Sequence, residues 1–240
     1  MQPHTIASYD VDLKALEQLV TEMAAAVERA FESANRAMFE ANVELAHQVI
    51  AGDRAIDALQ QRVEEKAIFT IATRQPVAID LREIVSTIRL ANDLERIGDL
   101  AKNVAKRVIT IREQSGSLKA ASSLQPLASA VREQLHNVAA AYRNRDDAAA
   151  LVVWRADGPI DALHTSLFRE LLTYMMEDPR SIGFCTHLLF CAKNLERVGD
   201  HATNIAEIVH YMISGKMLSE DRPKADESSG VDPNWEPNKS

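Results

Sequence analysis

The chain of 240 residues is long enough for one or two domains, and its 46% hydrophobic content is that of a folded protein rather than a disordered one. Ala, Leu, Glu, Arg and Gln are abundant and aromatic residues are scarce, which favours helix over sheet. The formal net charge of −8 disfavours binding to nucleic acid or anionic lipid, because phosphate groups repel a net anion. No run approaches about 18 apolar residues, so no membrane-spanning helix is expected.

The ends of the sequence and its thiols point to an intracellular protein. Met1-Gln2-Pro3-His4 lacks the basic and apolar regions of a secretory signal, so we expect a cytoplasmic location. Cys185 and Cys191 are spaced as neither a redox pair nor a zinc site. We therefore expect both thiols to be ordinary helix residues without a redox role.

Apolar residues recur at helical spacing through most of the chain. In the first half this spacing predicts a long helix from about 13 to beyond 38. A second helix is expected to begin at Gly52-Asp53 and to end at Gln75-Pro76, because proline disfavours helical geometry in the residue before it. A third is predicted over 81–108, and Ser115-Gly116-Ser117 is the expected join to the second half.

The second half repeats this order, with helices predicted from about 123 to 143, from 159 to 177, and from the break at Asp178-Pro179 to about 214. The motif Glu95-Arg96-Ile97-Gly98-Asp99 returns 101 residues later as Glu196-Arg197-Val198-Gly199-Asp200. The sequence therefore predicts an all-α protein of two tandem three-helix bundles with a pseudo-twofold internal repeat. The expected divisions are 1–116, 117–217 and a disordered acidic and polar tail over 218–240.

A second acidic pair precedes each copy of the motif. Asp53 and Asp57 are spaced four apart, on one helical face, and return as Asp157 and Asp161. In an antiparallel helical hairpin, residues equidistant from the turn lie level, because both arms rise by the same amount per residue. Reflection through the two turns places eight carboxylates level in pairs: Asp57 with Glu95, Asp53 with Asp99, Asp161 with Glu196, and Asp157 with Asp200.

Four carboxylates on one hairpin seam repel one another unless cations compensate them. Such oxygen donors suit divalent or trivalent ions such as iron, manganese, magnesium or zinc, and carboxylates can bridge several ions. We therefore predict a metal site in each half, with Asn103 and Asn204 as possible supporting ligands one turn further along. The alternative is structural: Asp53 and Asp157 would cap helix starts, and Arg54, Arg96 and Arg197 would neutralise the other carboxylates. Gly98 and Gly199 are expected to permit close helix packing.

Three Glu-x-x-His patterns suggest another chemistry, because this spacing supplies ligands in ferritin-like di-iron proteins. They are Glu44/His47, Glu133/His136 and Glu207/His210. The enzyme alternative is therefore a carboxylate-bridged, metal-dependent oxidoreductase, although none of the three occurs at repeat-equivalent positions. His201, beside Asp200, has Leu100 as its counterpart and is expected to pack or to support a ligand. Because phosphate-binding loops and nucleophile motifs are also missing, the sequence favours binding or regulation over catalysis.

With these motifs the chain resembles the PhoU family of bacterial phosphate-uptake and phosphate-response regulators. The resemblance covers about residues 5 to 215. It rests on three segments: Arg74-Gln-Pro-Val-Ala-Ile-Asp-Leu-Arg82, Leu94-Glu-Arg-Ile-Gly-Asp99 and Leu195-Glu-Arg-Val-Gly-Asp-His-Ala-Thr-Asn-Ile205. It implies two three-helix bundles, no enzymatic activity, and metal clusters on the eight carboxylates named above. Two departures, Asn194 in place of a second Asp93 and the missing second copy of Asp80-Leu81-Arg82, imply that the two sites differ.

The resemblance also implies partners. It predicts a negative regulator of phosphate uptake and of the phosphate-starvation regulon, in keeping with cellular phosphate homeostasis. The expected partners are the ATPase subunit of the phosphate ABC transporter, the phosphate sensor histidine kinase and a second copy of the chain. Membrane association would be peripheral, through these partners only.

Overall fold

The structure is a computed structural model that describes residues 3–112 and 118–218 of the chain. The described residues are helical almost throughout and contain no strand. Three long helices make the first bundle: α1 (Pro3–Glu40), α2 (Val43–Arg74) and α3 (Ala78–Arg112). The predicted join at 115–117 and the predicted tail from 219 onward lie outside the described residues. None of the described helices is both long enough and apolar enough to cross a membrane.

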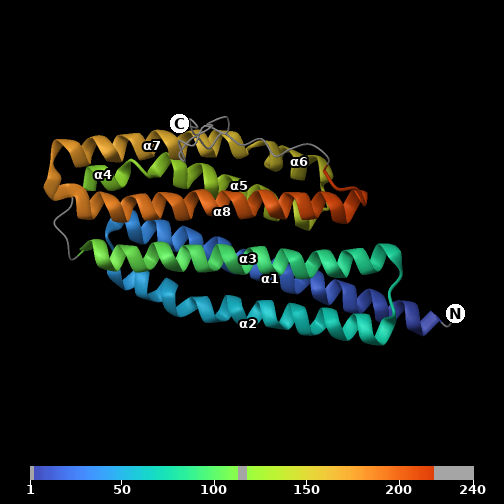
Figure 1. Cartoon of the computed structure of the whole chain (residues 1–240). Coiled ribbons are helices and arrows are strands. Elements are labelled where there is room, and N and C mark those ends of the chain that lie inside the picture. The colour runs from blue at the N-terminus through green and yellow to red at the C-terminus, as the bar shows by residue number, and fades with distance from the viewer. Residues whose placement is uncertain (1–2, 113–117, 219–240) are drawn as a thin grey trace, which may run out of the picture.

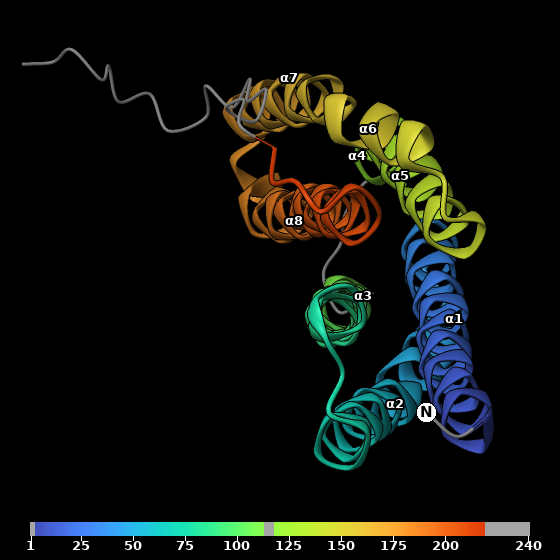
Figure 2. The ribbon, with the colours of Figure 1, turned by 90° about the vertical axis from the view of Figure 1, so that its right-hand side faces the viewer.

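The second bundle repeats the first with more interruptions. Its elements are α4 (Leu118–Ser122), α5 (Gln125–Asn144), α6 (Asp147–Arg155), α7 (Asp157–Glu177), the 3-10 turn η1 (Pro179–Ser181) and α8 (Ile182–Ser214). The two bundles lie side by side with α3 and α8 adjacent along their length (Figure 1). Seen along the helices, α1 and α5 join the bundles on one side (Figure 2). The predicted fold of two tandem three-helix bundles is confirmed.

The predicted start of the second helix is wrong. α2 begins at Val43, and the Asn42 side chain caps it by accepting a hydrogen bond from the Leu45 amide at 3.0 Å. The helix then continues through Gly52, with Leu45 and Val49 buried on its inner face. Packing of this face outweighs the local cost of a glycine inside a helix. Asp53 is therefore an interior residue of α2 and not a helix cap.

The second half has a helix that the sequence analysis missed, α6, which corresponds to the first part of α2. Where α2 is continuous, the second half breaks at Ala156, between α6 and α7. Pro159 explains the break: without an N–H it cannot donate to the carbonyl of Arg155. Within the first turn of a new helix the missing N–H costs nothing. Asp157, the counterpart of Asp53, consequently stands at the beginning of α7.

The repeated glycines hold the hairpins close. A Cβ atom at Gly98 would lie 3.1 Å from Cδ1 of Ile56 on α2. At Gly199 it would lie 3.2 Å from Oε1 of Gln134 and 3.4 Å from the side chain of Ile160 on α7. The predicted role of the glycines in close packing is confirmed. This contact sets the spacing between the helices that carry the acidic residues.

Candidate functional site: two carboxylate clusters

The first cluster consists of Asp53 and Asp57 on α2 with Glu95 and Asp99 on α3. A lysine lies inside it: Lys102 Nζ contacts Asp53 Oδ2 and lies 2.6 Å from Asp99 Oδ1. This contact joins the two carboxylates that the hairpin geometry placed level. Sequence reasoning missed Lys102, although its spacing of three residues from Asp99 puts it on the same helical face.

Burial and like charges raise the proton affinity of this cluster. Burial, followed by the charges of Asp53 and Asp99, raises the pKa of Asp57 above its ordinary value. Burial and the charge of Asp99 raise the pKa of Glu95. Burial lowers the pKa of Lys102, but hydrogen bonds to Asp53 and Asp99 outweigh it and raise that pKa overall. The lysine is therefore charged and partly neutralises the carboxylates around it.

The second cluster consists of Asp157 and Asp161 on α7 with Glu196 and Asp200 on α8. It is more deeply buried than the first, with Asp157, Asp161 and Glu196 exposed by 2%, 4% and 5%. The position that corresponds to Lys102 holds Thr203, whose hydroxyl donates to Asp157 Oδ1 at 3.2 Å. A neutral hydroxyl thus takes the place of an ammonium group beside the more buried carboxylates.

Glu196 is the carboxylate in this cluster with an unsatisfied atom. Its Oε1 accepts a hydrogen bond from Lys193 Nζ at 2.8 Å, whereas its Oε2 is buried without a hydrogen-bond partner. Burial raises the pKa of Glu196, the hydrogen bond from Lys193 opposes this, and the charges of Asp200 and Asp161 raise the pKa further. An uncompensated buried carboxylate oxygen is costly, and a cation at this place would remove the cost.

The structure supports the structural alternative only in part. Asp53 lies inside α2, whereas Asp157 lies in the first turn of α7 and accepts a hydrogen bond from Thr203. Arg96 contacts Glu95 at 3.6 Å and Asp99 at 4.0 Å, but its side chain is largely exposed, which leaves these ion pairs weak. A position at a helix start therefore accounts for at most one of the two repeats.

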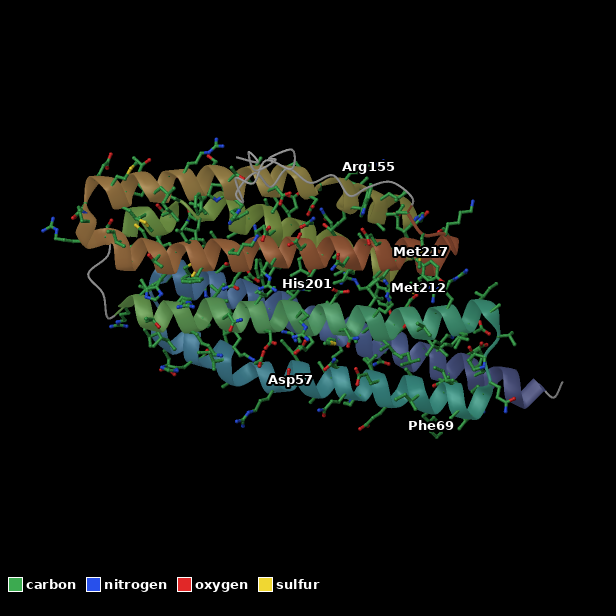
Figure 3. All side chains as sticks on the ribbon, in the orientation of Figure 1. Asp57, Phe69, Arg155, His201, Met212 and Met217 are labelled. Carbon is green, nitrogen blue, oxygen red and sulfur yellow. The ribbon has the colours of Figure 1, made fainter. Side chains whose placement is uncertain are left out.

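The predicted supporting ligands face elsewhere. Asn204 Nδ2 donates to Asp93 Oδ1 at 3.4 Å, across the seam between α8 and α3. Asn103 lines a hollow together with Asn194 of α8. His201 points into the same seam, between the ribbons of α8 and α3, whereas Asp57 lies on α2 (Figure 3). The two asparagines thus join the halves of the chain rather than completing the clusters.

The Glu-x-x-His pairs do not share a site. His136 lies 3.2 Å from Glu28 on α1. Trp154 donates to Glu207 at 2.9 Å, and His210 Nδ1 lies 2.6 Å from Asp147 Oδ1. Throughout residues 3–112 and 118–218, no three His, Cys, Asp or Glu side chains are arranged to hold one metal ion as they stand. The ferritin-like alternative therefore gains no support, and an ion in either carboxylate cluster would require side chains to turn toward it.

Comparison with known proteins identifies the architecture. A family model described as "PhoU domain" matches the chain twice, at residues 20–108 and 124–209. The phosphate-specific transport system accessory protein PhoU homolog of Rhizobium meliloti is 49% identical over 94% of this chain and 95% of its own length. The homolog with the same description from Caulobacter vibrioides is 44% identical over 94% of this chain and 98% of its own length.

Solved structures agree with these matches. The crystal structure of PhoU from Pseudomonas aeruginosa superposes with a TM-score of 0.84 at 35% identity, covering 87% of this chain and all of that chain. That of the phosphate transport system regulatory protein PhoU from Streptococcus pneumoniae gives a TM-score of 0.80 at 26% identity, over 88% of this chain and all of that one.

Proposed function

Because the chain belongs to the PhoU family, we propose that it is a negative regulator of phosphate uptake and of the phosphate-starvation regulon. The observation that carries the proposal is the match of both repeats, at 44–49% identity, to proteins described as accessory proteins of a phosphate-specific transport system. A similar solved structure is described as a phosphate transport system regulatory protein. The proposed role is regulatory and not enzymatic, and it serves phosphate homeostasis.

We further propose that the chain acts in the cytoplasm as a homodimeric adaptor between the transporter's ATPase subunit and the cytoplasmic region of the sensor histidine kinase. Its surface suits an adaptor. Large apolar side chains are exposed around the α2–α3 turn, where Phe69 lies at the outer end of α2 (Figure 3). Others nearby in sequence are Ile68, Val77, Ile79 and Leu81. Exposed apolar groups gathered in this way are typical of surfaces that bind other proteins.

Co-purification tests the adaptor role. The full chain, with a tag, should retain the transporter's ATPase subunit and the kinase's cytoplasmic region, separately and together. An Ile79→Ser variant should lose at least one partner, because a polar side chain weakens an apolar interface. Met176→Ser, which changes a similarly exposed apolar residue on the second hairpin, is the matched control. Failure of the wild-type chain to retain either partner would contradict the adaptor role.

We also propose that the carboxylate clusters bind metal ions such as iron, manganese, magnesium or zinc. The donor chemistry fits, since each cluster offers four carboxylates and buried Glu196 Oε2 has no hydrogen-bond partner. The clusters differ in the lysine that compensates them. Lys102 contacts two carboxylates of the first cluster, Asp53 and Asp99, whereas in the second cluster the more exposed Lys193 contacts Glu196 and leaves its Oε2 without a hydrogen-bond partner. The second cluster, with Asp157, Asp161, Glu196 and Asp200, is therefore the stronger candidate. In the first, an ion would have to displace the Lys102 ammonium from Asp53 and Asp99.

Metal analysis after loading with iron or manganese tests this proposal. We expect bound metal and a higher Tm, because a ligand that binds only the folded state stabilises it. Glu196→Ala with Asp200→Ala should remove more metal than Glu95→Ala with Asp99→Ala. Neither pair should unfold the helices, since these carboxylates contribute little apolar burial. Loaded protein that holds no metal and melts at an unchanged temperature would contradict the cation sites.

A further inference from the structure

A basic hollow lies between α3 and α8, and no carboxylate of either cluster lines it. Its volume is about 300 Å³, and its lining consists of Asn103, Lys106, Arg107, Thr110, Phe190 and Asn194. The lining contains two cationic side chains and two amides but no carboxylate, in a chain whose formal net charge is −8. Side chains of this kind gathered around one space favour an anion as the ligand.

Arg107 is held in place before any ligand arrives. Its Nη1 lies 3.3 Å from Nδ1 of His187, and its guanidinium carbon lies 4.4 Å from the centre of the Phe190 ring. Stacking on an aromatic ring fixes the guanidinium plane, so less conformational freedom is lost when the fork meets a ligand. Within the described part of the chain, Arg107 and Lys106 form no ion pair with a carboxylate. Their charge is therefore left for a ligand.

The internal repeat supplies a comparison for this hollow. α3 and α8 pack antiparallel, because Arg107 near the end of α3 meets His187 near the start of α8, whereas Asp93 meets His201. A pseudo-twofold axis therefore relates the Lys106 end of the seam to the Asp93 end. At that opposite end, Lys106 is replaced by Glu207, Arg107 by Ile208 and Asn194 by Asp93. The two ends of one symmetric seam thus differ in charge, and only one suits an anion.

We propose that the hollow at Lys106 and Arg107 binds a phosphoryl group, either as inorganic phosphate or as the phosphate of a small metabolite. The guanidinium of Arg107 can donate two parallel hydrogen bonds to phosphate oxygens, and Lys106 adds a mobile point charge. The amides of Asn103 and Asn194 are further donors. With a volume of about 300 Å³, the hollow has room for a phosphate group.

The site stands on these residues alone, but its use as a sensor of phosphate rests on the proposed function. The site and its use as a sensor are tested by different measurements. Loss of binding to the purified full-length chain would overturn the site. Binding without any effect of the site variants on starvation genes would leave the site and overturn its use as a sensor.

Titration calorimetry with inorganic phosphate and with AMP tests the site on the purified full-length chain. Because charged donors dominate phosphate recognition, Lys106→Gln with Arg107→Gln should weaken binding by about tenfold or more. Arg107→Lys keeps the charge but loses the fork, so it should weaken binding less. Arg89→Gln removes an exposed charge at the position equivalent to Phe190, and it should change the affinity by less than about twofold.

Each outcome decides the proposal. Equal affinities for phosphate and AMP, both reduced by Lys106→Gln, support a site for the phosphoryl group itself. Tighter binding of AMP, reduced by the same variant, supports a nucleotide as its source. If Arg107→Gln disturbs folding, the exposed Lys106→Gln variant alone carries the test. The proposal is overturned if neither ligand saturates the chain at about 10 mM, or if Arg89→Gln weakens binding as much as Lys106→Gln.

Discussion

His201 Nδ1 and Asp93 Oδ1 lie 2.8 Å apart across the seam between α8 and α3. These are two positions at which the repeats differ, since Leu100 corresponds to His201 and Asn194 to Asp93. Two residues without a counterpart of the same type in the other repeat therefore contact each other. Asn204 adds a second hydrogen bond to Asp93. The polar contact lies within the packed α3–α8 seam, which joins one half of the chain to the other.

We predict that this contact couples the two residues energetically. Asp93→Asn and His201→Leu should each lower the free energy of unfolding by about 1 kcal/mol, the usual worth of a partly buried hydrogen bond. The double variant, which copies the Asn194 and Leu100 pair, should lose less than the sum of the two. Urea denaturation of the four proteins measures this. Strictly additive losses would show that the contact contributes nothing of its own.

Lys102→Thr and Thr203→Lys should have opposite effects on the metal bound by the two clusters. Lys102→Thr leaves Asp53 and Asp99 uncompensated, so the metal-free variant should lose about 1–3 kcal/mol and should gain affinity for divalent cations. Thr203→Lys places an ammonium beside Asp157 and should reduce the metal bound by the second cluster. Metal content and Tm with and without manganese report both effects.

The control for this exchange is Lys106→Thr, which removes a charge from the same helix outside the clusters. It should leave metal content unchanged. A Lys102→Thr variant that binds no additional metal would contradict the view that Lys102 competes with an ion for the first cluster.

Asp57 should make metal-free stability depend on pH. Its pKa is raised above the ordinary 3.8 by burial and by Asp53 and Asp99, so the folded state binds its proton more tightly than the unfolded state does. The protonated Asp57 side chain therefore contributes its full stabilisation below pH 3.8, and this stabilisation is lost as the pH rises through the raised pKa. Asp57→Asn should therefore stabilise the metal-free protein at pH 7, and this advantage should vanish on acidification.

Thermal unfolding of Asp57→Asn and wild type between pH 3.5 and 7, in about 0.15 M salt and a chelator, measures the effect. In the presence of metal the same change should weaken binding, because it removes a ligand charge. An advantage of the variant that stays constant over the whole pH range would contradict a raised pKa at Asp57.

Two glycines within long helices should respond in opposite ways to alanine. A Cβ atom at Gly52 would meet nothing within 4 Å, so Gly52→Ala should stabilise the chain by about 0.5–1 kcal/mol through helix propensity. At Gly98 it would crowd the buried Ile56 side chain, and an overpacking cost of about 1–3 kcal/mol should exceed that gain. Equal stabilisation by both changes, in urea denaturation, would show that the α2–α3 contact adapts without cost.

Much of the fold could be predicted from local signals. The proline turns and apolar spacing predicted both hairpins, and reflection through the turns correctly grouped Asp53 with Asp99. One helix start was predicted wrongly, and one helix was missed. Gly52-Asp53 looked like a helix start, but tertiary packing of Leu45 and Val49 carries α2 through it. α6, with nine residues, is too short for its periodicity to be distinct.

The site was only partly predictable, because some of its contacts depend on how the elements pack. Lys102 could have been found from its spacing to Asp99. The contacts of Asn204 and His201 with Asp93 depend on how the two bundles pack, which the symmetry of each hairpin does not determine. The pairing of charged groups across the α3–α8 seam is a property of the assembled molecule.

Expression of phosphate-starvation genes in a strain that lacks this chain, grown with plentiful phosphate, tests the regulatory role most directly. If the chain is a negative regulator, these genes should be expressed despite the phosphate, and the wild-type chain supplied from a plasmid should restore repression. Continued repression in the strain without the chain would contradict the account.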